Sequence, residues 1–185
     1  MTYLFLDVET TGFKKSGALI QEGQARVCQI AMLLTDENGK HLTEFSSLIK
    51  PDGWTISDGA HKVHGFTDEY CEQYGIEFRQ AVTIFLTLAQ KSKLIVAHNS
   101  EFDKGMVDIE KAYAYQGIEK YIDMNKEESS WHCTMKTNTH ITGGKWPKLE
   151  EALIHYTGYG LADNAHDAMY DVKACKEIFF ATRKS

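Results

Sequence analysis

Apolar and polar positions along the first 50 residues are arranged as strands joined by turns. Residues 3–6 form a short apolar run, and residues 26–35 form a second run that is too apolar to face water on both sides. Residues 41–49 alternate and carry β-branched and aromatic side chains, which is typical of an antiparallel partner strand. The Asn-Gly pair at 38–39 predicts a hairpin turn with positive φ at both central residues. The chain is therefore predicted to begin with three antiparallel strands.

Beyond residue 57 the pattern changes to strands that alternate with helices. Apolar residues recur at i, i+4, i+7 and i+11 between residues 102 and 113, one face of a helix, and this helix follows a short buried strand at 93–97. The other expected elements are short helical turns, three more helices and a last short strand, at residues 57–75, 77–91, 148–156, 168–180 and 131–134. This order predicts an α/β fold in which helices cover a mixed β-sheet.

Composition and charge narrow the class of protein only modestly. With 185 residues, 43% apolar and 25% charged, and no repeat or linker, we expect residues 1–185 to form a single soluble globular domain. No apolar run is long enough to span a membrane, no signal segment precedes the first strand, and the four cysteines are scattered, so we expect a reduced, cytoplasmic protein. The net charge of −6 argues against a broad nonspecific nucleic-acid binder, but not against an enzyme that holds nucleic acid through metal ions.

The first candidate for chemistry is the acidic pair Asp7 and Glu9, directly after the first apolar run. Side chains two residues apart on a strand point to the same face, so these carboxylates lie side by side. Unless a cation lies between them, each raises the pKa of the other. Oxygen ligands of this kind suit Mg²⁺ or Mn²⁺. Alternatively, the pair merely ends a strand where it meets solvent.

A second acidic feature follows the buried strand at 93–97, at a strand-to-helix junction where α/β proteins often place site residues. It comprises Asn99, Phe102 and Asp103. Two structural alternatives remain open. Ser100 and Asp103 could form a capping box at the start of the helix, and Asn99 could be a turn residue.

The third feature is His166 with Asp171, at the start of the last helix. An offset of five residues turns two helical side chains about 140° apart. The two can therefore converge only if His166 lies in the preceding loop and Asp171 in the opening turns of the helix. Alternatively, Asp167 and Asp171 are charges at the helix N-terminus and His166 is a surface residue.

In this order the three features resemble the motifs of the DEDD superfamily of 3′→5′ exonucleases, which includes epsilon-type proofreading subunits, ribonuclease T and oligoribonuclease. The motifs are Asp-x-Glu, Asn-x-x-Phe-Asp and His-x-Ala-x-x-Asp. A sister branch has tyrosine four residues before the last aspartate. Here that position is Asp167 and the residue before it is His166, so the resemblance is to the histidine branch.

The resemblance implies a ribonuclease-H-like fold and a site with two Mg²⁺ or Mn²⁺ ions. By this resemblance Asp7 bridges the two metals, Glu9 and Asp171 bind the first, and Asp103 supports the second. His166 is then the general base that accepts the proton of the attacking water, a role that suits histidine near neutral pH.

The resemblance also implies a set of substrate contacts. The backbone of Thr10 and Thr11, which follow the acidic pair, would contact the terminal sugar. Val63, His64 and the aromatic ring of Phe102 would contact the terminal base, and Asn99 would orient the site. His64 could equally be a plain turn residue.

We therefore expect a metal-dependent 3′→5′ exonuclease that releases nucleoside monophosphates from single-stranded DNA 3′ ends. It could act as a proofreading nuclease with a polymerase partner or as an independent repair nuclease. Two alternatives remain: an exoribonuclease of the same family, and a non-catalytic nucleic-acid-binding or polymerase-associated module. A polar and aromatic stretch at 145–149, Lys-Trp-Pro-Lys-Leu, either presents a stacking ring and two cations to nucleic acid or is an ordinary loop.

Overall fold

The computed structural model describes residues 1–117, 130–161 and 166–183. Its centre is a five-stranded mixed sheet with the strand order β3-β2-β1-β4-β5. The first three strands are antiparallel, and the last two run parallel to the first. Their bounds are Thr2–Thr10 (β1), Val27–Asp36 (β2), His41–Leu48 (β3), Leu94–Ala97 (β4) and Ser130–Cys133 (β5). The α/β prediction with three antiparallel strands is confirmed.

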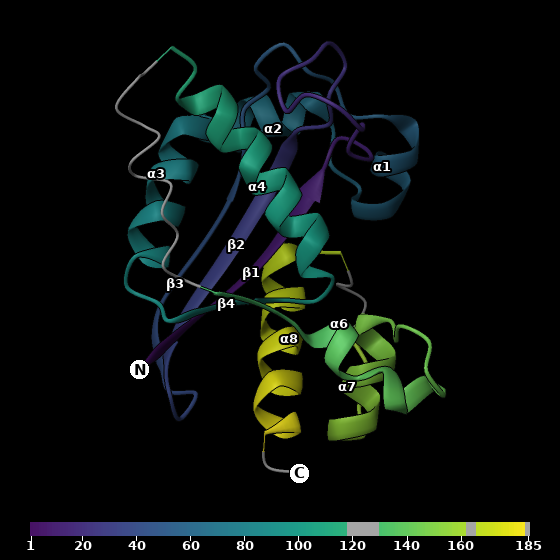
Figure 1. The fold of residues 1–185 in the computed structure, drawn as a ribbon. Coiled ribbons are helices and arrows are strands. Elements are labelled where there is room, and N and C mark those ends of the chain that lie inside the picture. The colour runs from purple at the N-terminus through teal and green to yellow at the C-terminus, as the bar shows by residue number, and fades with distance from the viewer. Residues whose placement is uncertain (118–129, 162–165, 184–185) are drawn as a thin grey trace.

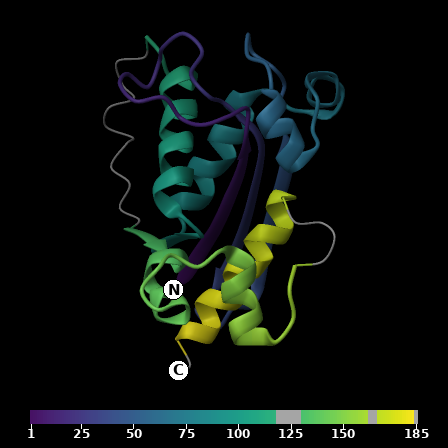
Figure 2. The ribbon, with the colours of Figure 1, turned by 90° about the vertical axis from the view of Figure 1, so that its right-hand side faces the viewer.

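Helices cover both faces of this sheet (Figures 1 and 2). The longer helices begin and end close to the predicted positions, and two four-residue helical segments were not predicted, because a single turn is too short to show a period. The bounds are Asp58–His64 (α1), Asp68–Tyr74 (α2), Phe78–Ala89 (α3), Ser100–Ala114 (α4), Thr134–Thr137 (α6), Thr139–Thr142 (the 3₁₀ helix η1), Leu149–Thr157 (α7) and Ala168–Thr182 (α8). Within the three described ranges, no helix is both long and apolar enough to cross a bilayer.

Successive side chains of β1 point to opposite faces of the sheet. Leu4 and Leu6 belong to the core that α3 and α4 cover, whereas Tyr3 and Phe5 pack against Phe179 of α8 on the opposite face. Figure 2 shows α4 and α8 on opposite sides of the sheet. Since the strand period is two, the odd-numbered acids of β1 face the side of α8.

The turn between β2 and β3 differs from the prediction at one residue. Gly39 has φ +84, but Asn38 is not among the described non-glycine residues with positive φ, so the expectation of positive φ at both positions was wrong. The carboxylate of Asp36 accepts hydrogen bonds from the N–H groups of Asn38 and Lys40, each 2.9 Å long, which holds a three-residue turn instead. A Cβ at Gly39 would also lie only 3.1 Å from the ring of Phe180.

A buried ion pair ties the start of β2 to α4. Arg26 donates two hydrogen bonds of 2.8 Å to the carboxylate of Glu110, and Glu110 also accepts one of 2.9 Å from the N–H of Val27. Both charged side chains are almost fully buried, and the guanidinium lies 4.0 Å from the ring centroid of Tyr113 and 5.0 Å from that of Phe78. This pair fixes the register between the sheet and α4, which carries Asp103.

Replacing Glu110 with alanine should lower the free energy of unfolding by about 3–5 kcal/mol, because Arg26 would remain buried without a counter-charge. Urea denaturation followed by tryptophan fluorescence measures the loss. As a control, Glu44→Ala removes an exposed ion pair with Lys173 and should cost under about 1 kcal/mol. Equal losses in the two variants would show that the buried pair does not hold the fold together.

Candidate active site

Asp103 is buried beside the acidic strand. Its side chain is 2% exposed, and interactions with the backbone at Asp103 itself and at Val8, which lies between Asp7 and Glu9, oppose the rise of its pKa. Asn99 occupies the N-cap position of α4 with φ 74 and ψ 47 and makes no side-chain capping bond, while Ser100 is already helical. The capping-box alternative is therefore wrong, and Asp103 faces the acids of β1.

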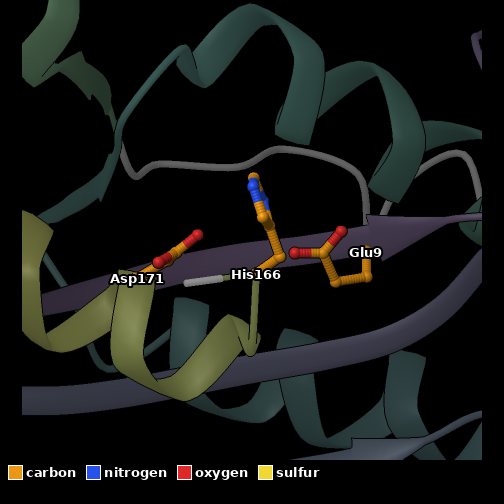
Figure 3. Close-up of side chains that lie close together, drawn as sticks. All are labelled: Glu9, His166 and Asp171. Carbon is orange, nitrogen blue, oxygen red and sulfur yellow. The ribbon is translucent and has the colours of Figure 1, made fainter. Parts of the chain in front are cut away.

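The start of α8 brings the last two motif residues to the same place. Asp167 is the N-cap and accepts a 2.9 Å hydrogen bond from the N–H of Met169. The alternative that Asp167 is a charge at the helix N-terminus is therefore confirmed for this residue. His166 lies before the helix with φ 72, a left-handed conformation that is costly for a non-glycine residue and often marks a functional site. Ligand atoms of Glu9, His166 and Asp171 all lie within 4.8 Å of one another, and Figure 3 shows the imidazole rising between the two carboxylates.

A residue that the sequence analysis missed positions this helix. Gln29 is the cross-strand partner of Glu9 on β2 and is 6% exposed. Its Oε1 accepts a 3.0 Å hydrogen bond from the N–H of Ala168, and its Nε2 lies 3.5 Å from Oδ2 of Asp167. The only signal in the sequence was an amide within the apolar run 26–35, which does not reveal its distant partner.

Burial and mutual repulsion raise the pKa of every one of the four motif carboxyls. Burial is the largest cause in each case. It raises the pKa of Asp7 well above its usual range, that of Glu9 to about 8 and that of Asp103 to about 8, with repulsion from neighbouring carboxylates adding to the effect. The pKa of Asp171 rises to about 6, with attraction to His166 opposing the rise.

These four carboxyls have the donor chemistry of a site for divalent cations. Oδ1 of Asp171 is buried and has no hydrogen-bond partner among the described residues, although buried carboxylate oxygens are normally satisfied. Closely spaced acids that repel one another are stabilised in their ionised form by a cation between them. Carboxylate oxygens are the ligands that Mg²⁺ and Mn²⁺ prefer. The residues present therefore fit such ions.

The residues expected to contact a substrate surround this cluster in different ways. The hydroxyl of Thr10 donates to the carbonyl of Gly12 at 2.8 Å, and that of Thr11 accepts from the N–H of Arg26 at 3.0 Å, so both hydroxyls are engaged within the protein. Asn99 is exposed at the start of α4, and Phe102 is partly buried against the core.

His64 is the last residue of α1, and its hydrogen bonds assign its tautomer. Its Nδ1 accepts from the N–H of Phe66 at 3.1 Å, so Nε2 carries the proton and donates to the carbonyl of Thr10 at 3.2 Å. Burial lowers the pKa of His64, and repulsion by His61 and His166 contributes in the same direction. The neighbouring Val63 side chain is 52% exposed.

Sequence comparisons matched a family model and several curated relatives. The RNase T model, described as an exonuclease, matches residues 4–179. The DNA polymerase III subunit epsilon of Salmonella typhimurium is 28% identical over 184 residues, which cover 96% of this chain and 70% of that protein. The PolC-type DNA polymerase III of Streptococcus sanguinis is 27% identical over 182 residues, 97% of this chain but 11% of the relative.

Solved structures show the same fold. Escherichia coli exonuclease I in complex with a dT13 oligonucleotide matches with a TM-score of 0.78 and 22% identity over 100% of this chain. The zinc-bound form of the complex of that enzyme with single-stranded DNA matches with a TM-score of 0.79 and 22% identity over 99% of the chain. The chain spans 41% and 40% of these two structures, respectively.

With a chelator present, the free energy of unfolding should fall by several kcal/mol as the pH rises from about 4 to about 8. Glu9 and Asp103 have folded-state pKa values of about 8, above the ordinary range of unfolded carboxyls, so the folded chain binds protons more tightly than the unfolded chain. That contribution is complete below about pH 4 and is lost as the pH rises through the folded-state values.

Thermal unfolding at pH 5 and pH 8, with EDTA or with Mg²⁺, measures this dependence. Mg²⁺ should remove most of the loss of stability between pH 5 and pH 8. In EDTA, Asp103→Asn should make that loss smaller, because one titrating carboxyl is gone. An unchanged pH dependence with and without Mg²⁺ would contradict the electrostatic description of the site.

Proposed function

The chain belongs to the RNase T exonuclease family and is a 3′→5′ exonuclease, and on that premise we propose that it removes nucleoside monophosphates from single-stranded DNA 3′ ends with the help of two divalent ions. The observation that carries this proposal is the convergence of Glu9, His166 and Asp171 within 4.8 Å, at the edge where Asp7 and Asp103 also lie. A nucleophilic side chain is not needed, since water is the nucleophile.

The four carboxyls would hold the ions, with Asp7 between them, Glu9 and Asp171 on one and Asp103 on the other. When bound, two such ions supply an activated water and stabilise the charge that develops on the leaving oxygen. The chain itself contributes the placement of these ligands. The hydrogen bond from the N–H of Ala168 to Gln29 fixes the start of α8 against β2, and acids from three separate elements meet in one array.

His166 is proposed as the general base. Its left-handed backbone conformation directs the ring toward Glu9 and Asp171, and its side chain is exposed, so a water molecule and a substrate phosphate can reach it. Imidazole is suited to accept a proton near neutral pH, and a nearby carboxylate such as Asp171 stabilises the imidazolium that forms.

Val63 and His64, beside the end of β1, would pack on the terminal base, with Phe102 beside it. A base between apolar and aromatic groups is bound with little sequence preference, as expected for a single-stranded end. The backbone of Thr10 and Thr11 is proposed to contact the terminal sugar, since both hydroxyls already bond within the protein. Asn99 would orient this edge of the site.

DNA is favoured over RNA because the solved structures similar in fold include complexes with a dT13 oligonucleotide and with single-stranded DNA. Relatives named as DNA polymerase III subunit epsilon and as PolC-type DNA polymerase III support a role in replication, with a polymerase as the partner. We further propose that residues 1–185 are one exonuclease domain that acts in the reducing cytoplasm. The four cysteines are buried and free, which suits that compartment.

A 5′-labelled single-stranded DNA oligomer should be degraded to a descending ladder in the presence of Mg²⁺ or Mn²⁺. Asp7→Asn should abolish the ladder, and His166→Gln should slow it by about 10²–10⁴-fold, because a general base typically contributes that much. His41→Gln, which changes an exposed histidine on β3 far from the cluster, is the matched control and should degrade DNA at the wild-type rate.

The same assay separates the alternatives. Faster degradation of the matched RNA oligomer would make RNA the substrate. If the wild-type protein binds the DNA oligomer but leaves DNA and RNA intact with either metal, the catalytic proposal fails, and the non-catalytic binding module replaces it.

A further inference from the structure

An exposed tryptophan with lysines around it lies close to the candidate site. The side chain of Trp146 is 64% exposed, and Nζ of Lys136 lies 6.0 Å from its ring centroid. Lys145 and Lys148 flank it in the sequence and are exposed. We call Lys136, Lys145, Trp146 and Lys148 the Trp146 patch. An aromatic face surrounded by cations is the combination that single-stranded nucleic acid uses for stacking and charge neutralisation.

The backbone of this patch is anchored on both sides of Trp146. The carbonyl of Lys145 accepts a hydrogen bond from the hydroxyl of Thr142. The carbonyl of Pro147 accepts a 3.0 Å bond from Nε2 of His98, whose Nδ1 is 2.9 Å from the hydroxyl of Thr134. Because His98 directly follows β4, the patch is tied to the sheet edge that carries the site. A surface fixed in advance loses little conformational entropy when it binds a ligand.

An ion pair connects the same patch to the helix that carries Asp103. Lys136 of α6 lies 2.5 Å from the carboxylate of Glu101, which is in the first turn of α4, two residues before Asp103. His64 bonds the carbonyl of Thr10 at the end of β1, whereas Lys136 joins the patch to Glu101 at the start of α4. The Trp146 patch and His64 therefore adjoin the carboxylates from different elements of the fold.

The charge around Trp146 differs from the charge around other exposed aromatic side chains. The ring centroids of Tyr70 and Tyr74 of α2 lie 4.9 Å apart in a tilted arrangement, but the helix that carries them is acidic, with the sequence Asp-Glu-Tyr-Cys-Glu-Gln-Tyr. Such a surface repels phosphates. By contrast, neither Lys145 nor Lys148 has an ion-pair partner within 4.0 Å in the described parts of the chain. Their charge is available to a phosphate backbone.

We propose that the Trp146 patch binds the nucleotides on the 5′ side of the scissile bond, with a base stacked on Trp146 and backbone phosphates on the lysines. This inference rests on the proposed exonuclease function and deepens it. The 3′-terminal nucleotide occupies the His64 end of the site, and the strand leaves across the carboxylates toward α6. A substrate of only two nucleotides is too short to reach the patch.

Trp146→Ala should raise KM for a 12-nucleotide single-stranded DNA by about 5- to 100-fold, the range that loss of one stacked base produces. Its kcat on this oligomer, and both constants on a DNA dinucleotide, should stay at wild-type values. Trp146→Phe should restore most of the affinity. The double variant Lys145→Ala/Lys148→Ala should make binding of the 12-mer less dependent on salt, because fewer counterions are released.

Tyr159→Ala and Lys40→Ala are the matched controls, since Tyr159 is 59% exposed beyond the far end of α7 and Lys40 lies in the β2–β3 turn. Both should behave as wild type. An unchanged KM of Trp146→Ala on the 12-mer, or an equal loss on the dinucleotide, would overturn the inference. If the wild-type protein cleaves neither substrate, the proposed function fails, and the Kd of the 12-mer, measured by fluorescence anisotropy with Ca²⁺, still tests the patch by itself.

Discussion

The structure depends on one electrostatic constraint, the gathering of four carboxyl groups at the end of β1. The two-residue period of the strand forces Asp7 and Glu9 onto one face, α4 adds Asp103, and α8 adds Asp171. Burial and mutual repulsion raise the pKa of all four, so the array is unfavourable in its ionised form without cations. A fold that keeps such an array has a use for the cations that stabilise it.

Most of the surrounding polar interactions serve to hold the carboxylates in place. Gln29 joins β2 to the first turn of α8, and the buried pair of Arg26 and Glu110 joins the start of β2 to α4. Each interaction connects β2, the neighbour of the acidic strand, to a helix that carries one of the four carboxyls. The rigidity of these supports matters for the proposed two-metal hydrolysis, which requires the ligands to be preorganised before the substrate arrives.

The sequence was sufficient to predict the strands and the longer helices, because strand and helix periods are local properties, and the resemblance of its motifs to a known exonuclease family indicated the residues of the cluster. It also required His166 to precede the last helix, since an offset of five cannot share a helical face. It did not predict Gln29 as a support, the tautomer of His64 or the N-cap at Asn99, all of which depend on partners far away in the chain or on backbone geometry. The turn at Gly39 differed because the carboxylate of Asp36 selects it.

Calorimetric titration with Mn²⁺ near pH 7, in two buffers of different ionisation enthalpy, tests the electrostatic origin of the site most directly. We predict that two ions bind per chain and that binding releases protons, because Glu9 and Asp103 hold protons at that pH until a cation takes their place. Asp171→Asn removes one of the four carboxylates and should weaken the binding of Mn²⁺. Binding that releases no protons, or the absence of binding by the wild-type protein, would contradict the claim that repelling carboxyls create a divalent-cation site.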